Sequence, residues 1–312
     1  MPRFDVTIAG ELNLDLILYG LPAELSPERE LLADGMVLTL GSSSAIVAHN
    51  LASLGNRVGF QSLIGEDPLG QIALERLAQS GVDTSRVRTS KSTSTGLSVI
   101  LLREGWRNIL TYPGAIAKLS LDDLDLDYLA DARHFHLSSY YLQAGLRPHV
   151  PELFRRLKAA GLTISLDAND DPEDSWGDDL RQALAHVDIF LPNRREACKI
   201  AATDNLEIAM QKLSELVPLL VVKLGAEGAV ASRNDEKTES AALNVETVDP
   251  VGAGDSFDAG FLHAYLQGRS LKECLAAGNA AGALCATRAG GTEAFRDREH
   301  QEKFLQQHAE LG

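Results

Sequence analysis

The sequence is poor in cysteine and in aromatic residues. Its 312 residues include three cysteines, and only 5% are Phe, Trp or Tyr. The odd number and wide spacing of Cys198, Cys274 and Cys285 exclude a disulfide framework and a CxxC metal site. We therefore expect three small hydrophobic side chains in a protein of a reducing compartment.

The sequence also lacks an excess of positive charge and long apolar runs. Its net charge of -15 at pH 7 disfavours non-specific binding to nucleic acid or to an anionic membrane surface. No apolar run approaches the ~18 residues of a membrane-spanning helix, and charged residues come too early at the N-terminus for a secretory signal. We expect a cytoplasmic protein that binds neither nucleic acid nor membranes.

The sequence does contain short apolar runs that alternate with helical patterns. The run 219–222 is apolar throughout, which is typical of a central strand in a parallel sheet. We expect strands at 6–9, 58–64, 97–102, 134–137, 163–166, 189–191, 219–223 and 229–232, and helices at 45–54, 70–79, 153–160 and 180–185. The alternation predicts an α/β fold with a mostly parallel sheet and helices on both faces.

Two segments break this alternation. Residues 12–40 show little helical pattern, and 95–111 holds two strand-like runs joined by Glu104-Gly105-Trp106, which predicts a hairpin. Together they are expected to form a small β-layer, either a lid over a site or an oligomer interface. Their alternation suits pairing with a second copy, so a homodimer through this layer is a hypothesis.

Polar residues follow the first predicted strand. Glu11, Asn13 and Asp15 alternate with leucines, so a strand there would place all three on one face. Such a face is either half-exposed or a hydrogen-bonding surface for a hydroxylated ligand, since ligands of open α/β sheets bind beyond the carboxyl ends of strands. Asp167 and Asn169 follow another strand and are equally well explained as turn or capping residues.

The most informative segment is a glycine-rich turn that leads into a helix, Asp249-Pro250-Val251-Gly252-Ala253-Gly254-Asp255. Phe257, Phe261 and Tyr265 recur at helical spacing, so free amides at the helix start would form an anion site. The sequence lacks GxxxxGK[ST] and a complete GxGxxG. Asp255 is either a helix N-terminal acid or a general base for a hydroxyl that attacks a bound phosphoryl group.

At these residues the chain resembles the ribokinase-like (PfkB) carbohydrate kinases. Residues 249–257 resemble the second signature of that family, and 41–55 resemble the first. The resemblance extends in order through the GxDxxG-like turn 64–70, the NxxE of 193–196, the KxGxxG of 223–228 and the helix 278–288. It implies one domain over 1–312, a three-layer α/β/α sandwich whose small β-sheet lid is formed by about 12–40 and 95–114.

The resemblance also implies an activity, the ATP- and Mg²⁺-dependent phosphorylation of a sugar hydroxyl. Asp255 would be the catalytic base, and the amides of Gly252, Ala253 and Gly254 would form the anion hole. Asn193 and Glu196 would position Mg²⁺, often through water, although the same pair also fits a helix capping box.

Further roles follow from the resemblance. Those expected along the nucleotide are Lys223, Gly225, Gly228 and Asn279, the last equally well explained as a helix-packing amide. Those expected at the sugar are Asn13, Asp15, Gly41 and Ser42. A monovalent cation such as K⁺ would lie at Asp249 and Val251.

The chain departs from the family pattern at several positions. Ser42 replaces a glycine, and Ile46 stands where many members carry an asparagine that contacts the sugar. Asn50, one turn further on, is either a substitute for that asparagine or a buried structural amide. Asp170-Asp171-Pro172 stands where many fructokinase-like and keto-deoxygluconate kinase-like members carry an arginine. A carboxylated or phosphorylated sugar would favour such a cation, so its absence leads us to expect a neutral substrate. Arg103 and Arg107 are the other candidates for a charged substrate group.

Three rival readings remain. A nucleoside or another small alcohol could be the substrate, with Tyr19, Trp106 or Tyr112 stacking on a base. A catalytically inactive sugar-binding regulator would not need Asp255 or the two glycines. A nicotinamide dehydrogenase is disfavoured because the dinucleotide fingerprint is missing.

Overall fold

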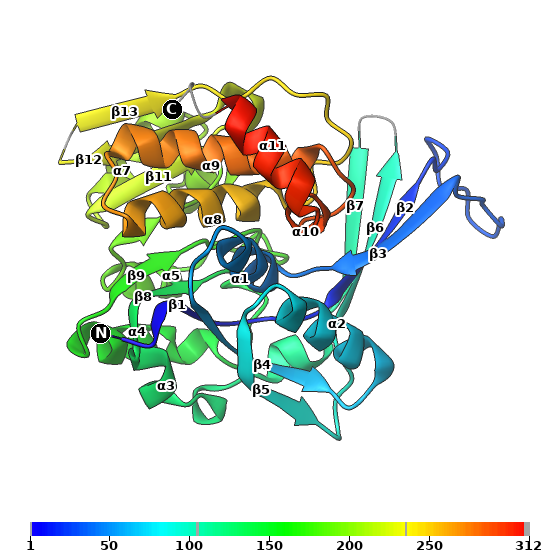
Figure 1. The fold of residues 1–312 in the computed structure, drawn as a ribbon, viewed down its shortest axis with the longest axis horizontal. Coiled ribbons are helices and arrows are strands. Elements are labelled where there is room, and N and C mark those ends of the chain that lie inside the picture. Colours follow the sequence, from blue (N-terminus) through cyan, green and yellow to red (C-terminus); the bar gives the residue numbers. More distant parts are fainter. Residues whose placement is uncertain (1, 104–105, 235, 309–312) are drawn as a thin grey trace.

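The central sheet of the molecule has nine strands in the order β13-β12-β11-β10-β9-β8-β1-β4-β5. The structure is a computed structural model that describes residues 2–103, 106–234 and 236–308 (Figure 1). The strands are β1 (Phe4–Ala9), β4 (Val58–Gly65), β5 (Asp83–Ser90), β8 (Ala132–Leu137), β9 (Thr163–Leu166), β10 (Ile189–Phe190), β11 (Leu219–Lys223), β12 (Ala229–Arg233) and β13 (Glu236–Ser240). Only the pairs β11–β12 and β12–β13 are antiparallel, so the sheet is mostly parallel as predicted.

Helices cover both faces of this sheet. One face carries α1 (Ser43–Ser53), α2 (Pro68–Gln79), α8 (Ala253–Leu266) and α9 (Leu271–Ala286). The other carries α3 (Leu126–Ala130), α4 (Val150–Ala159), α5 (Asp179–Leu184), α6 (Arg194–Ile200) and α7 (Leu206–Ser214). α10 (Glu293–Arg296) and α11 (Arg298–His308) pack beside α9. Side chains alternate along a strand. In β11, Leu219 and Val221 therefore pack against the helices of the first face, while Leu220 and Val222 pack against those of the second.

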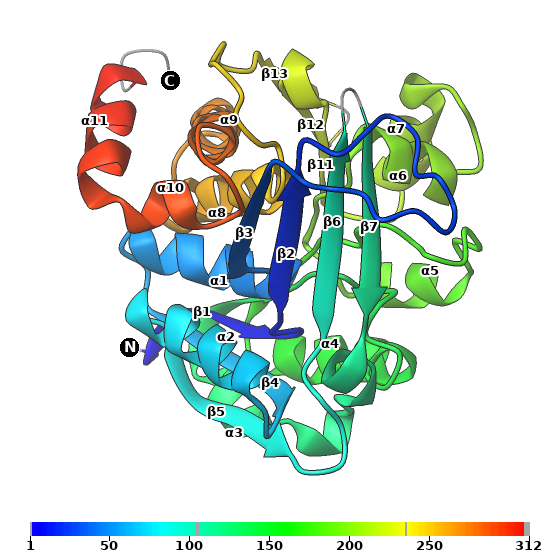
Figure 2. The same ribbon diagram turned by 90° about the vertical axis from the view of Figure 1, so that its right-hand side faces the viewer.

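A second, smaller sheet has the order β3-β2-β6-β7 and is called the small sheet below. Its strands are β2 (Leu14–Tyr19), β3 (Gly35–Leu40), β6 (Leu97–Arg103) and β7 (Trp106–Tyr112). Figure 2 views it face-on, with the central sheet behind it. Glu104 and Gly105, which were predicted to make the hairpin turn, lie outside the described residues. β2 begins at Leu14, so Glu11 and Asn13 belong to the crossover that leads into the small sheet rather than to a strand.

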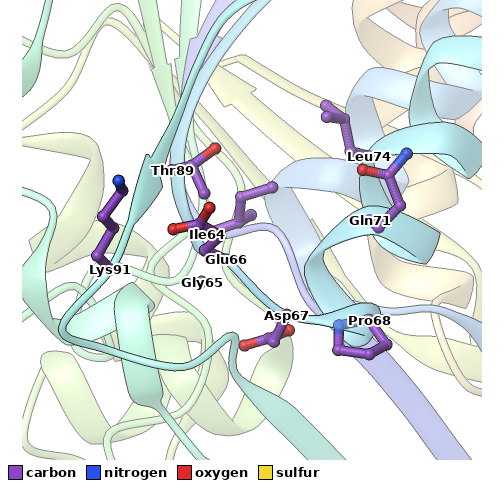
Figure 3. A pocket seen from close by; sticks show the side chains of 9 residues that line it. All are labelled: Ile64, Gly65, Glu66, Asp67, Pro68, Gln71, Leu74, Thr89 and Lys91. Atoms are coloured by element: carbon purple, nitrogen blue, oxygen red, sulfur yellow. The ribbon is translucent and has the colours of Figure 1, made fainter.

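The turn between β4 and α2 anchors the base of the small sheet. Asp67 caps α2 by accepting a hydrogen bond from the Gly70 amide, and its other oxygen accepts one from the Thr95 amide at 2.7 Å. Thr95 in turn accepts one from the Gly65 amide. Figure 3 shows the hollow of about 540 Å³ beside this turn. Asp67, which lines this hollow, is already engaged in both anchoring bonds.

Among the described residues, no helix is both long and apolar enough to cross a membrane.

Candidate active site

The glycine-rich turn ends where α8 begins, at Ala253. Gly252 has φ 76°, and a Cβ there would lie 2.5 Å from the Cα of Gly291, so the position requires glycine. The Ala253 amide donates to the carbonyl of Pro250, so it is not free to take part in the anion hole as the resemblance implied. Within the described chain, the amides of Gly254 and Asp255 have no hydrogen-bond partner. Two free N–H groups at the start of a four-turn helix are a suitable anion site.

Asp255 lies at this anion site and is almost fully buried. Burial raises the pKa of its carboxyl group to about 7, and the nearby Asp167 adds to the increase. Lys223 and a hydrogen bond from Ser43 oppose it. A carboxylate with a pKa near neutrality can accept a proton from a hydroxyl and release it again.

Asn13, Asp15, Gly41 and Ser42 lie together beside α1. The Gly41 amide donates to the carbonyl of Asn13, and a Cβ on Gly41 would overlap with the carboxylate of Asp15. Ser42, at φ 61°, donates through Oγ to the carbonyl of Glu11 at 2.9 Å. Burial, and then the charge of Asp255, raises the pKa of Asp15 to about 7. Asp15 and Asp255 therefore act on each other and belong to one site.

Glu11 is a buried carboxylate that the sequence placed beside these residues. It accepts hydrogen bonds from the Ser44 amide and, at 2.6 Å, from the Ser44 hydroxyl. It therefore lies at the N-terminus of α1, where a negative charge is favourable. Burial raises its pKa, and the hydroxyls of Ser139 and Ser44 oppose the increase.

The small sheet adds hydroxyl groups that sequence reasoning missed. Thr39, Asp15, Ser98 and Thr111 are cross-strand neighbours and share one face. The Ser98 hydroxyl is 3.1 Å from that of Thr111 and 3.4 Å from Nδ2 of Asn13. On the same face, Ile17 and Ile100 pack against Val251, so this face is turned toward the anion site. The sequence indicates that Ser98 and Ile100, two residues apart, lie on the same face of β6. It does not indicate which strand β6 pairs with, so the position of this face could not be predicted.

Asn50 joins α1 to the C-terminal part of the site. Its Nδ2 donates to Oγ of Ser256 at 2.9 Å and to the carbonyl of Gly291 at 3.1 Å. Its Oδ1 lies 2.9 Å from His49, and the residue is fully buried. Both amide protons are thus used within the protein.

Asn193 and Glu196 form a complete capping box at the start of α6. The Asn193 side chain accepts from the Glu196 amide at 3.0 Å, and Glu196 accepts from the Asn193 amide at 2.8 Å. Burial, and then the charge of Asp167, raises the pKa of Glu196 to about 8. The pair therefore caps α6, and Glu196 is also close enough to Asp167 for the two charges to interact.

Lys223, at the end of β11, is held by two carboxylates. Its Nζ is 2.6 Å from Oδ2 of Asp167 and 3.1 Å from both carboxylate oxygens of Asp258. Burial alone would lower the pKa of Lys223, but Asp167 and Asp258 outweigh it and hold the pKa above its ordinary value. Asp258 was missed because an acid inside a helix belongs to no motif and its partner lies 35 residues away.

Gly228 and Asn279 both lie against the carbonyl of Ser240, whereas a Cβ placed on Gly225 would meet nothing within 4 Å. Gly228 has φ 102°, and a Cβ there would overlap with the carbonyl of Ser240. Asn279 donates to that carbonyl at 3.0 Å and to the carbonyl of Ala241 at 3.1 Å. Asn279, Ser240 and Ala241 line a cavity of about 300 Å³ between α8, α9, α11 and the segment after β13.

Asp249 links the glycine-rich turn to the small sheet. It accepts hydrogen bonds from the Val251 amide, the Gly290 amide and, at 2.9 Å, the Tyr19 hydroxyl. The carbonyl of Val251 lies 3.4 Å from the Cys285 thiol. These oxygens are of the kind a monovalent cation takes, although the Asp249 carboxylate is already occupied by three donors.

The two arginines of the small sheet differ. Arg103 donates to the carbonyl of Ala23, between β2 and β3, which is a structural contact. Arg107 is exposed and is paired in register with Leu102, on the face that also carries Ser98. His134 and His136 are buried and hydrogen-bonded to Ser165. Burial lowers the pKa of His136 to about 4, and the charges of Asp167 and Lys223 also act on it.

The described residues contain no cluster of three His, Cys, Asp or Glu side chains that could hold a metal directly. The charge of Asp167 nevertheless raises the pKa of Glu196, of Asp255 and of Asp258, and Lys223 opposes all three increases. This excess of negative charge fits a hydrated Mg²⁺, which keeps most of its water ligands.

The chain is similar to known proteins over most of its length. The sequence model of the pfkB family carbohydrate kinases matches residues 3–298. The chain is 31% identical to a 2-dehydro-3-deoxygluconokinase of Bacillus subtilis, over 85% of this chain and 86% of that one. It is 30% identical to a cytidine kinase of Thermococcus kodakarensis, over 88% and 93%. A putative ribokinase II from E. coli, solved with ATP and Mg²⁺, matches with a TM-score of 0.86 at 27% identity, over 98% of this chain and all of that one.

Proposed function

Because the chain belongs to the pfkB family of carbohydrate kinases, we propose that it transfers the γ-phosphoryl group of ATP to a hydroxyl of a neutral sugar. In this proposal residues 1–312 form a single kinase domain, and the small sheet is its lid. The turn 252–255 is the observation that supports the proposal most strongly. Within the described chain, the amides of Gly254 and Asp255 have no hydrogen-bond partner, and burial raises the pKa of the Asp255 carboxyl group to about 7.

The proposed reaction begins when the sugar hydroxyl gives its proton to Asp255. The hydroxyl oxygen then forms a bond to the γ-phosphorus while the bond between that phosphorus and the bridging oxygen of ADP breaks. The proton remains on Asp255 until solvent takes it, and ADP leaves with the electron pair of the broken bond. The amides of Gly254 and Asp255, at the turn formed by Gly252 and Ala253, stabilise the charge on the transferring group, a contribution of about 3–4 kcal/mol for one good donor.

The nucleotide would lie along Lys223, Gly225, Gly228 and Asn279, next to the 300 Å³ cavity. Asn193 and Glu196 would hold Mg²⁺ through water. When bound, Mg²⁺ supplies positive charge to the phosphate oxygens, and it would also favour the ionised form of Glu196.

Asn13 and Asp15 would hydrogen-bond the sugar, with the backbone of Gly41 and Ser42 close to it. Asn50 supports this proposed sugar site because its hydrogen bonds connect α1 to Ser256 and Gly291. A neutral substrate is favoured because Glu11, Asp15 and Asp255 are buried acids that lack a cationic partner among the described side chains on the sugar side. Exclusion of water by the small sheet would limit ATP hydrolysis.

The test is ADP release with MgATP over a panel of pentoses, hexoses, sugar acids and nucleosides, for the wild type and Asp255→Asn. We expect one neutral sugar to stimulate release, and the variant to lose at least about a hundredfold in kcat, as expected for a general base. Stimulation by a nucleoside instead would support the cytidine kinase-like alternative. No turnover with any compound, but a sugar-dependent rise in Tm, would support an inactive sugar-binding regulator.

Potassium is a further part of the proposal. Activity measured in KCl and in tetramethylammonium chloride tests whether Asp249 and Val251 bind a monovalent cation. Equal rates in the two salts would reject this site.

We also propose that the outer face of the small sheet pairs with a second copy of the chain. Leu38, Leu16, Val99 and Leu110 are cross-strand neighbours there, and Leu110 keeps 59% exposure. Sedimentation at micromolar concentration is expected to give twice 33.6 kDa, and Leu110→Glu is expected to give the single mass. A single mass for the wild type would reject the dimer.

A further inference from the structure

The ammonium group of Lys223 has one donor to spare. An ammonium carries three N–H donors. Asp167 accepts from one at 2.6 Å. The two oxygens of Asp258 are each 3.1 Å from Nζ and belong to one carboxylate, so they lie too close together in direction to take separate N–H groups, and we assign them one shared donor. No other hydrogen-bond acceptor reaches Nζ within the described chain. The Lys223 side chain keeps 11% exposure, whereas Asp167 and Asp258 have 1% and 0%, so the lysine borders the open site while the acids lie behind it.

This ammonium stands beside the anion site. A methyl group placed on Gly254 would lie 3.8 Å from Nζ, so the charge is next to the first turn of α8. Gly254 also has one of the two amides of this turn that lack a partner within the described chain. Asp258 lies one turn after Asp255 on α8, so the residue that holds the lysine and the candidate base share one face of the helix.

We propose that Lys223 binds the transferring phosphoryl group through its third donor, and that Asp258 is a positioning residue that holds the ammonium in place. This inference rests on the proposed function and deepens it. Phosphoryl transfer depends on charges fixed in advance around the three equatorial oxygens. A lysine free to rotate would have to be ordered in each catalytic cycle, whereas two carboxylates fix its position before ATP arrives.

Stability alone does not explain this arrangement. Taking three charges out of water carries a desolvation penalty that often equals or exceeds their mutual attraction, and apolar replacements of such triads are frequently neutral or stabilising. The arrangement is also placed at the anion site rather than elsewhere in the core. Both facts favour a role in the reaction.

The charges around Asp255 come from several elements. Glu11 follows β1, Asp15 is on β2, Asp167 follows β9, Lys223 ends β11, Cys285 is on α9, and Asp258 is on α8 itself. Removing the positive charge of Lys223 leaves acids in excess and favours the protonated base. Removing the negative charge of Asp258 has the opposite effect, because the ammonium remains.

The test compares Lys223→Met with Asp258→Asn. We expect Lys223→Met to lower kcat at least about a hundredfold with the sugar KM within threefold of the wild type, because a donor made in the transition state is lost. We expect Asp258→Asn to lower kcat about tenfold, because the ammonium is still present but less well held. We expect the acidic limb of kcat/KM to move to higher pH in Lys223→Met and to lower pH in Asp258→Asn.

Asp179→Asn is the matched control. It breaks the pair between Arg147 and Asp179, where Nη2 and Oδ1 are 3.0 Å apart, and this pair lies outside the site. We expect it to change Tm but neither kcat nor the pH limb. If Lys223→Met and Asp258→Asn lose activity only in proportion to their Tm, or move the limb in the same direction, the triad is structural and the inference is wrong. If Asp255→Asn is fully active, the proposed function fails instead.

Discussion

Buried carboxylates have different partners on the two sides of the site, which we call the sugar side and the phosphate side after the ligands proposed for them. On the sugar side, Glu11 is held by the hydroxyl and amide of Ser44, and Asp15 lies among Ser98 and Thr39 of the small sheet. On the phosphate side, Asp167 and Asp258 are paired with Lys223. The first arrangement offers acceptors and repels anions, while the second fixes a cation. The difference suits a site that takes a neutral polyol from one side and a phosphate from the other.

The largest expected effect is on the pH dependence of the rate, which tests the uncompensated acids of the sugar side. Burial raises the pKa of both Asp15 and Asp255 to about 7. If Asp255 must be ionised to accept a proton, kcat/KM for the sugar falls at least about tenfold for each unit below pH 7, or about a hundredfold at pH 5. Initial rates between pH 5 and 9, with circular dichroism to check folding, measure this. A flat profile from pH 5 to 8 would contradict it.

A smaller effect separates the two sides by their Michaelis constants. Asp15→Ala removes a charged hydrogen-bond acceptor of about 1.5–3 kcal/mol, so we expect the sugar KM to rise about 10- to 100-fold. The KM for ATP is expected to stay unchanged, because Asp15 lies on the small sheet. Asp15→Asn keeps the shape and is the control for packing against Gly41. An equal rise in both constants would mean that the two sides are not independent.

Two glycines of the turn allow a sharper comparison within the phosphate side. Gly252→Ala meets both a positive φ and the Cα of Gly291, so we expect a loss of about 2–3 kcal/mol and a fall in Tm of several degrees. Gly254→Ala meets only Nζ of Lys223 at 3.8 Å, so Tm is expected to stay constant while kcat falls several-fold. Thermal unfolding and steady-state rates of both variants measure this. Equal losses of Tm would show that Gly254 is also a backbone requirement.

The smallest expected effect concerns stability. The folded-state pKa of Asp15 and of Asp255 is raised above the ordinary 3.8, so each contributes stability that is fully present below about pH 4 and is lost as the pH rises through about 7. Asp15→Asn and Asp255→Asn are therefore expected to raise Tm by a few degrees at pH 8 and to leave it unchanged at pH 4. Calorimetry of both variants at the two pH values measures this. A lower Tm at pH 8 would show that the ionised acids are better paired than their surroundings indicate.

Most strands of the central sheet could be predicted from the sequence because they are apolar on both faces. The prediction 163–166 coincides with β9, and 219–223 coincides with β11. β5 was not predicted, because it is an edge strand whose sequence DTSRVRTS is polar and carries little apolar alternation. The small sheet was expected from its two irregular segments, but its strand order was not, since pairing between β2 and β6 depends on contacts across about 80 residues.

The site was predictable where motifs carry it and not where tertiary contacts do. The turn 249–255 could be interpreted as an anion site because its glycines and the helix that follows are local features. Ser98, Thr111 and Asp258 could not be found in the same way. Ser98 and Thr111 reach the site through the register of β6 with its neighbouring strands, and Asp258 through its ion pair with Lys223 of β11. The bond between Tyr19 and Asp249 joins residues 230 positions apart, which no local pattern records.

The bonds of Asn50 have a consequence for the order in which the molecule can be completed. Its amide reaches Ser256 and Gly291, which follow it by 206 and 241 residues. During synthesis on the ribosome, α1 therefore emerges long before the groups that satisfy its buried amide exist. The proposed sugar site, which Asn50 supports, reaches its final form only after residues 249–291 have followed. A nascent chain arrested before residue 249 would carry Asn13 and Asp15 but could neither close its binding wall nor consume ATP.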